Sequence, residues 1–99
     1  MRKNRKQPPA LVDVSLSIVL PDAASVCLAG TFNDWNPAAM PLRSDSAHLW
    51  AGKLRLEPGR YEYRIVADGV WIDVPGARET VANPFGSRNA VLTVAALSR

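Results

Sequence analysis

The fold is decided by residues 61–73, which read YEYRIVADGVWID. Two runs rich in apolar residues flank the pair Asp68-Gly69 in this stretch. Both positions of a two-residue type I′ turn need a positive φ, and an Asp-Gly pair adopts that conformation at low cost. The stretch therefore predicts a tight β-hairpin in which Ala67 lies opposite Val70.

This register sorts the side chains of the hairpin onto two faces, because successive side chains of a strand point to opposite sides. One face is almost wholly apolar and is expected to be the core: it carries Tyr61, Tyr63, Ile65, Ala67, Val70 and Ile72. The other face is polar apart from two members: it carries Glu62, Arg64, Val66, Trp71 and Asp73. The register thus predicts a tryptophan on the solvent side, beside an arginine that lies opposite an aspartate.

Strand signals recur along the rest of the chain, and helix signals do not. The further predicted strands are 12–20, 25–29, a short one at 40–42, 49–56 with Trp50 on its inward face, and 89–96. The segments 31–46 and 74–88 are rich in Asn, Asp, Pro, Gly and Ser, which indicates loops. Six or seven short strands in 99 residues predict one all-β domain, an immunoglobulin-like (early-set) antiparallel β-sandwich.

The positive charge of the chain is concentrated at its start. The formal net charge is +3, but four of the twelve Lys and Arg lie within the first six residues, and the remaining eight stand against nine Asp and Glu. We therefore divide the chain into a basic, disordered arm at 1–10 and a nearly neutral β-sandwich at 11–99. Such an arm could also contact nucleic acid or an anionic membrane.

Compartment and membrane association follow from hydropathy and cysteine content. No stretch approaches the roughly 20 apolar residues that a membrane-spanning helix requires, so no membrane partner is expected. The apolar residues after the basic start alternate with polar ones, a pattern typical of a strand and not of a secretion signal. Cys27 is the only cysteine, so no disulfide can form within the chain. These features predict a cytoplasmic protein.

Two tryptophans are placed where burial does not explain them. An indole can stack on the apolar face of a sugar ring while a nearby arginine donates hydrogen bonds to the hydroxyls, and Trp71 beside Arg64 offers this pair. The same pair could stack on nucleobases, or Trp71 could simply cover the edge of the core. Trp35 sits in a polar loop, where it could contact a ligand or anchor the loop on the core.

Four ordered motifs resemble a known family. They are AGTFNDWN at 29–36, EPGRYEYR at 57–64, VADGVW at 66–71 and NPFGSRNAVL at 83–92. Together they resemble a family 48 carbohydrate-binding module, the glycogen-binding domain of the β subunit of AMP-activated protein kinase. They are also similar to the N-terminal modules of isoamylases and branching enzymes. The resemblance extends over residues 14–94.

The resemblance implies a ligand and a set of contacts. The ligand is an α-1,4-linked glucan, namely glycogen, amylose or maltooligosaccharides. The family's carbohydrate-binding positions fall on two cradling tryptophans, a basic strand residue, a loop apolar residue, a hydroxyl and an amide: Trp35, Trp71, Arg64, Phe85, Ser87 and Asn89. Two departures stand out. Arg64 replaces a lysine, and the sequence Asp73-Val74-Pro75 separates an acid and a proline that are usually adjacent.

Catalysis is not expected. Glycoside hydrolysis needs two carboxylates about 5–9.5 Å apart in a cleft, whereas Asp34 and Asp73 lie in or beside the predicted sugar platform. His48, the only histidine, has no ligand cluster around it, so no metal and no cofactor are expected. The predicted function is a non-catalytic glucan-binding module that localises a partner or senses glucan. The alternative is an adaptor that docks a kinase or a glycogen-metabolising enzyme, and nucleic-acid binding is the less favoured third reading.

Overall fold

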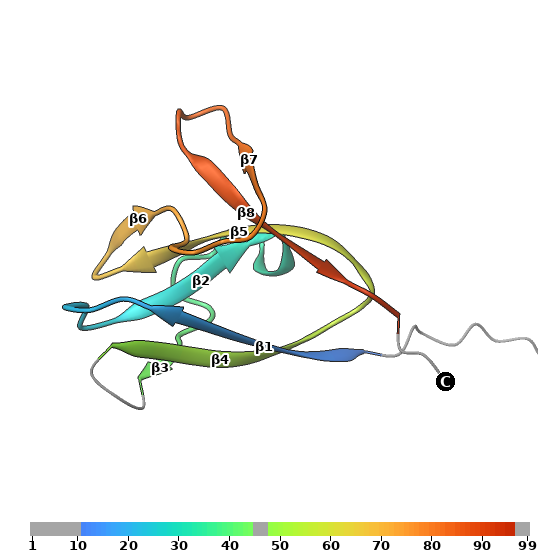
Figure 1. Ribbon diagram of the computed structural model, residues 1–99, viewed down its shortest axis with the longest axis horizontal. Coiled ribbons are helices and arrows are strands. Elements are labelled where there is room, and N and C mark those ends of the chain that lie inside the picture. Colours follow the sequence, from blue (N-terminus) through green and yellow to red (C-terminus); the bar gives the residue numbers. More distant parts are fainter. Residues whose placement is uncertain (1–10, 45–47, 97–99) are drawn as a thin grey trace, which may run out of the picture.

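Two antiparallel sheets make up the part of the chain that the computed structural model describes, residues 11–44 and 48–96 (Figure 1). The three-stranded sheet has the order β1-β4-β3, with β1 at Val12–Val19, β4 at Leu49–Leu56 and β3 at Arg43–Ser44. The five-stranded sheet has the order β2-β5-β8-β7, with β2 at Val26–Gly30, β5 at Gly59–Ala67, β8 at Arg88–Val94 and β7 at Thr80–Ala82; β6 at Val70–Ile72 pairs with β5. A 3-10 turn, η1 at Thr31–Asn33, follows β2. The predicted all-β, immunoglobulin-like sandwich is confirmed.

The β5–β6 hairpin has the register that the sequence predicts. Ala67 pairs with Val70, and the two turn residues Asp68 and Gly69 have φ values of 51° and 82°. The Asp68 carboxylate also accepts hydrogen bonds from the backbone of the segment before β2, including one of 2.8 Å from the Ser25 amide. The turn is therefore fixed both by its own backbone and by a contact with its neighbour.

The core lies between the sheets and is filled from the predicted inward faces. Its most deeply buried large side chains are Val26, Leu28 and Ile65. Trp50 is 8% exposed, and its indole Nε1 donates to the Leu20 carbonyl at 3.2 Å, so its one polar atom is satisfied. Val70 was predicted to face inward but is 59% exposed, because it begins β6, an edge strand at the tip of the hairpin.

The five-stranded sheet contains a fork, which we define as the point where β5 changes its neighbour from β8 to β6. Tyr63 pairs with Ala90 of β8, and Ile65, two residues on, pairs with Ile72 of β6. Both partners lie on the edge of β5 that faces away from β2. Arg64 therefore sits at the fork itself, with its side chain on the outer face of the sheet.

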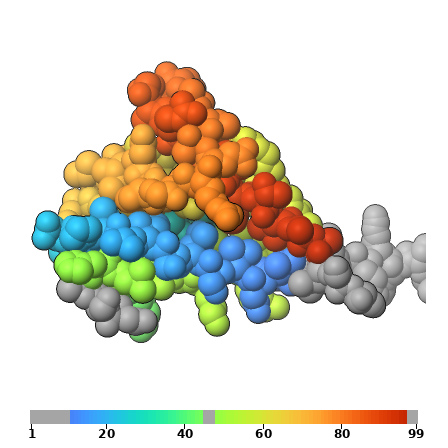
Figure 2. Space-filling model, viewed as in Figure 1, coloured from blue at the N-terminus to red at the C-terminus, as the bar shows by residue number. Residues whose placement is uncertain are grey.

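Two predicted loops contain regular structure. Residues 74–88 include β7, which pairs with the start of β8 through Thr80–Ala90 and Ala82–Arg88 and forms a hairpin that projects from the body (Figures 1 and 2). This strand was missed because only three residues pair, too few to show a period among the surrounding Pro and Gly.

In the other predicted loop, η1 forms, the strand expected at 40–42 is reduced to an isolated antiparallel bridge between Pro41 and Cys27, and β3 follows it. Residues Met40 and Leu42 form backbone hydrogen bonds with β2, of 2.9 and 2.8 Å, and so close one side of the sandwich. The predicted basic arm at 1–10 lies outside the described residues. Within those residues, no helix has the length and apolar character needed to cross a membrane.

Candidate functional site

A groove of about 500 Å³ opens on the outer side of the five-stranded sheet, between β6 and the β7–β8 hairpin. It is lined by side chains from four separate segments of the chain: Trp35, Arg64, Trp71, Asn83, Pro84, Phe85 and Asn89. Five of the six residues predicted to bind carbohydrate thus lie along one groove. The sixth, Ser87, does not line it.

The two tryptophans reach the groove by different routes. Trp71 extends from β6 on the outer face, remains 37% exposed, and pairs in register with Val66, which is 7% exposed. Trp35 is half-buried and follows Asp34, and both residues have left-handed backbone conformations, with φ values of 59° and 56°. Such a conformation is unfavourable for a bulky residue and persists only where its surroundings hold it.

The segment before Trp35 provides that support. The Trp35 amide donates to the Gly30 carbonyl at 2.9 Å, and the Asn33 side chain accepts from the Gly30 amide at 3.0 Å. Gly30 itself packs tightly on β5: a Cβ atom there would collide with the Glu62 carbonyl oxygen. The motif that the sequence presents at 29–36 therefore fixes the backbone that carries Trp35.

Phe85 stands at the tip of the β7–β8 hairpin and is 90% exposed. The tip is nevertheless well ordered by hydrogen bonds: the Asn83 side-chain Oδ1 accepts from the Phe85 amide at 3.0 Å and from the Ser87 amide at 3.2 Å. Gly86 supplies the positive φ, 86°, that the turn requires. Phe85 thus presents an exposed ring to the groove from a loop whose backbone is fixed.

Asn83 is a site residue that the sequence reasoning missed. Besides ordering the tip, its Nδ2 donates to the Ser87 Oγ at 2.9 Å and to the Asn89 Oδ1 at 3.0 Å. The hydroxyl of Ser87 is thus engaged with Asn83, and Ser87 is not among the residues that line the groove. The available signal was the Asn-Pro pair in a predicted loop, since Asn side chains often bond the backbone a few residues on.

Asn89 is held from both ends of its amide group. It is 8% exposed, and its Nδ2 donates to the Glu62 Oε1 at 3.0 Å while its Oδ1 accepts from Asn83. The hydrogen bond from Asn89, together with Arg60 at 2.8 Å, lowers the pKa of the Glu62 carboxyl below its ordinary value. The support that the ionised Glu62 gives Asn89 is therefore complete at neutral pH and is lost as the pH falls through that lowered pKa.

Arg64 lies at the fork with its guanidinium fixed by Asp73. The distance from Arg64 Nη2 to Asp73 Oδ1 is 2.8 Å, and the arginine side chain is 15% exposed, against 53% for the aspartate. Among the described residues, the buried Nε of Arg64 has no acceptor. The pairing of Arg64 with Asp73 agrees with the register that the hairpin predicts.

The chemistry of the groove suits a neutral ligand with apolar faces and hydroxyl groups. Its walls are aromatic, its polar groups are amides and one guanidinium, and the adjacent charges are paired, Arg64 with Asp73 and Arg60 with Glu62. Within residues 11–44 and 48–96, no group of three His, Cys, Asp or Glu is placed to hold a metal ion.

Residues 20–98 match the model of a protein family described as the glycogen recognition site of AMP-activated protein kinase. The chain belongs to this family. The function predicted from the sequence, a module that binds α-glucan, is confirmed at the level of this glycogen-recognition family.

Three relatives share the module within longer proteins. The chain is 40% identical over 72 residues to the protein FLOURY ENDOSPERM 6, chloroplastic, of Oryza sativa subsp. japonica, a match that covers 73% of the chain and 13% of that protein. It is 36% identical over 56 residues to the PTST homolog 2, chloroplastic, of Arabidopsis thaliana, covering 56% and 10%. It is 41% identical over 59 residues to a 1,4-alpha-glucan branching enzyme, GlgB 2, of Xanthomonas campestris pv. campestris, covering 57% and 8%.

These relatives correct the predicted cellular location, and their lengths limit what can be inferred from their activities. The expected cytoplasmic location is contradicted by the rice and Arabidopsis proteins, whose names place them in the chloroplast. Neither the single cysteine nor the missing secretion pattern can distinguish a plastid from the cytoplasm, since neither feature depends on that difference. Because the chain spans only 8–13% of these relatives' lengths, their overall activities do not transfer to it directly.

The role of Asn83 can be tested by Asn83→Ala. We expect glucan affinity to fall about three- to tenfold, because the change removes hydrogen bonds worth about 0.5–1.5 kcal/mol each that hold Phe85 and Asn89 in place. Isothermal titration with maltoheptaose measures the loss. Ser15→Ala, on the outer face of the other sheet, is the control and should bind like the unchanged chain. Full affinity in Asn83→Ala would show that the tip orders itself without this side chain.

Proposed function

We propose that the groove is the glucan-binding site of this module. Sugar rings of an α-1,4-linked chain stack on Trp35 and Trp71, while Arg64 and Asn89 donate hydrogen bonds to the hydroxyls. The observation that supports this most strongly is convergence: five residues from distant motifs line one groove, and its nearby charges are already paired. Glycogen, amylose and maltooligosaccharides all present the required surface.

Phe85 supplies a third apolar contact in this proposal. Its ring stands free at the end of the hairpin, on the opposite side of the groove from Trp71, where it can reach past the rim into a bend of the polymer. Ser87 contributes indirectly, because its hydroxyl is engaged with Asn83. Asp73, one residue earlier than the family's usual acid, is used to hold Arg64.

We further propose that the module has no catalytic step of its own. A glycosidase needs a carboxylic acid that stays protonated near neutral pH, whereas the pKa of Glu62 is lowered and Asp73 is paired with an arginine. The module then serves to bring the rest of its protein, or an enzyme or kinase partner, to the polymer. One relative is named for a reaction on 1,4-alpha-glucan, which is consistent with recruitment to that substrate.

A retention experiment tests the proposal. The chain should be retained on insoluble amylose and not on cellulose, and the double variant Trp35→Ala/Trp71→Ala should be retained on neither. Retention should be the same at low and moderate salt, because contacts with neutral hydroxyls release no counterions. Equal retention on both polymers, or loss of retention as salt rises, would point to a different ligand.

A further inference from the structure

The fork leaves the groove with two rims that no backbone ladder joins. One rim is β6 with its continuation to Asp73, and the other is the β7–β8 hairpin. Each pairs with its own part of the sheet, and within the described residues no strand pairing connects β6 to β7 or β8. Each rim is attached to β5, but a direct connection between the two rims across the groove has to come from side chains.

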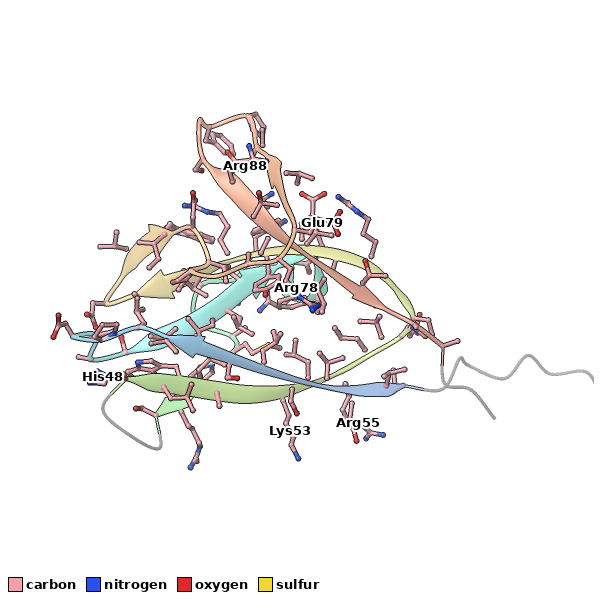
Figure 3. The ribbon with its side chains drawn as sticks, viewed as in Figure 1. His48, Lys53, Arg55, Arg78, Glu79 and Arg88 are labelled. Atoms are coloured by element: carbon pink, nitrogen blue, oxygen red, sulfur yellow. The ribbon has the colours of Figure 1, made fainter. Side chains whose placement is uncertain are left out.

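One carboxylate oxygen bridges this gap. Asp73 Oδ1 accepts a hydrogen bond of 2.8 Å from Arg64 Nη2, on β5, and another of 3.3 Å from the backbone amide of Arg88, the first residue of β8. A single side chain thus joins the end of the β6 rim to the floor of the fork and to the hairpin at Arg88, which pairs with Ala82 next to the turn. Figure 3 shows Arg88 on that hairpin, which stands above the sheet.

The side chains that we propose to bind the ligand lie within two residues of the groups that Asp73 joins. Trp71 precedes Asp73 by two residues on one rim, and Asn89 follows Arg88 immediately on the other. Arg64, between them, has its guanidinium oriented by the same carboxylate. A shift of Asp73 would therefore change the spacing between the stacking surface and the amide donor.

We propose that Asp73 is a positioning residue that fixes the width of the groove, and that this width makes the site select the curvature of its glucan. The inference rests on the proposed function of the groove. A groove of fixed width accepts a ligand that already has the right bend at little entropic cost, whereas a groove that can widen loses this preference. Asp73 acts through Arg64 and the Arg88 amide, without itself contacting the sugar.

The test compares a rigid and a flexible ligand of the same size. Binding of cyclomaltoheptaose, a closed ring of α-1,4-linked glucose, and of linear maltoheptaose is measured by titration calorimetry for each variant. Asp73→Ala should weaken binding of the ring about tenfold, the cost of a charge-assisted hydrogen bond, and that of the linear chain about threefold. Asp73→Asn keeps an acceptor oxygen in place and should preserve the ratio of the two affinities.

A matched control is available on the opposite sheet. Asp13→Ala also deletes an exposed carboxylate that pairs with an arginine, Arg55, at 3.2 Å, and Figure 3 shows Arg55 on the far side of the sandwich. This variant should bind both ligands as the unchanged chain does. A general effect of lost charge or stability would appear equally in Asp13→Ala, so an equal loss there would overturn the proposal.

A measurement on the ligand-free protein tests the role of Asp73 independently of the proposed glucan binding. Amide hydrogen exchange at Arg88 should become faster in Asp73→Ala and stay slow in Asp73→Asn and Asp13→Ala. If the unchanged chain binds neither glucan, the proposed function fails and curvature selection fails with it. If it binds both, but Asp73→Ala weakens them equally or leaves the exchange at Arg88 unchanged, only the role of Asp73 is overturned.

Discussion

Trp50→Ala is expected to destabilise the domain by about 3–5 kcal/mol, because it empties the space of a large side chain that is 8% exposed in the core. The free energy of unfolding of a domain of this size is about 5–15 kcal/mol, so much of the stability would be lost. The change also leaves the Leu20 carbonyl without the indole that donates to it. Urea denaturation followed by circular dichroism measures the difference.

The matched control for this change is Trp71→Ala, the same deletion on the outer face. It should lower the free energy of unfolding by about 1 kcal/mol or less, since the indole is partly exposed and its main neighbour in register is Val66. Equal destabilisation by the two changes would mean that Trp71 belongs to the core and that the groove is wrongly placed.

The largest effect on binding is expected from Trp71→Ala. Loss of a stacking surface should weaken binding of maltoheptaose by about 1–3 kcal/mol, by analogy with bases stacked on aromatic side chains. Trp35→Ala should behave similarly, although the left-handed backbone at Asp34 and Trp35 could relax once the indole is gone. Titration calorimetry measures both affinities, and the thermal midpoint reports whether each variant is folded.

The control for binding is Trp71→Phe, which keeps an aromatic face of smaller area and should retain part of the affinity. If Trp71→Ala bound glucan as well as the unchanged chain while remaining folded, stacking on β6 would not be the basis of recognition. The same result with Trp35→Ala would leave Phe85 as the principal apolar contact.

The sequence predicted the site most accurately where one short stretch determines geometry. The two-residue turn at Asp68-Gly69 fixes the register of its hairpin, and strict alternation then places Arg64 and Trp71 on the outer face. The pairing of Arg64 with Asp73 follows from the same register. These features depend on residues within one short hairpin, so contacts with the rest of the chain do not alter them.

The parts that were missed depend on contacts between distant segments. β7 exists because the edge of β8 that faces away from β5 is free to pair, which no pattern at 80–82 reveals. The role of Asn83 depends on Asn89 and Ser87 lying beside it after the hairpin has closed. The division of the sheet at the fork likewise needs three strands to be in place, so the sequence of β5 alone does not predict it.

Because side chains alternate along β5, the residues that stabilise the fold and the residues that face the ligand occupy different positions of one strand. Tyr63 and Ile65 maintain the sandwich, and Arg64 between them faces the groove. Substitutions at the outward positions could accumulate in a lineage without loss of the fold, so that a descendant would keep the sandwich and yet recognise another polymer, or none. An insertion of one residue in β5 would exchange the two sets and abolish folding and recognition together. The binding capacity of any chain with this architecture is therefore best judged from its outward positions, not from the preservation of its core.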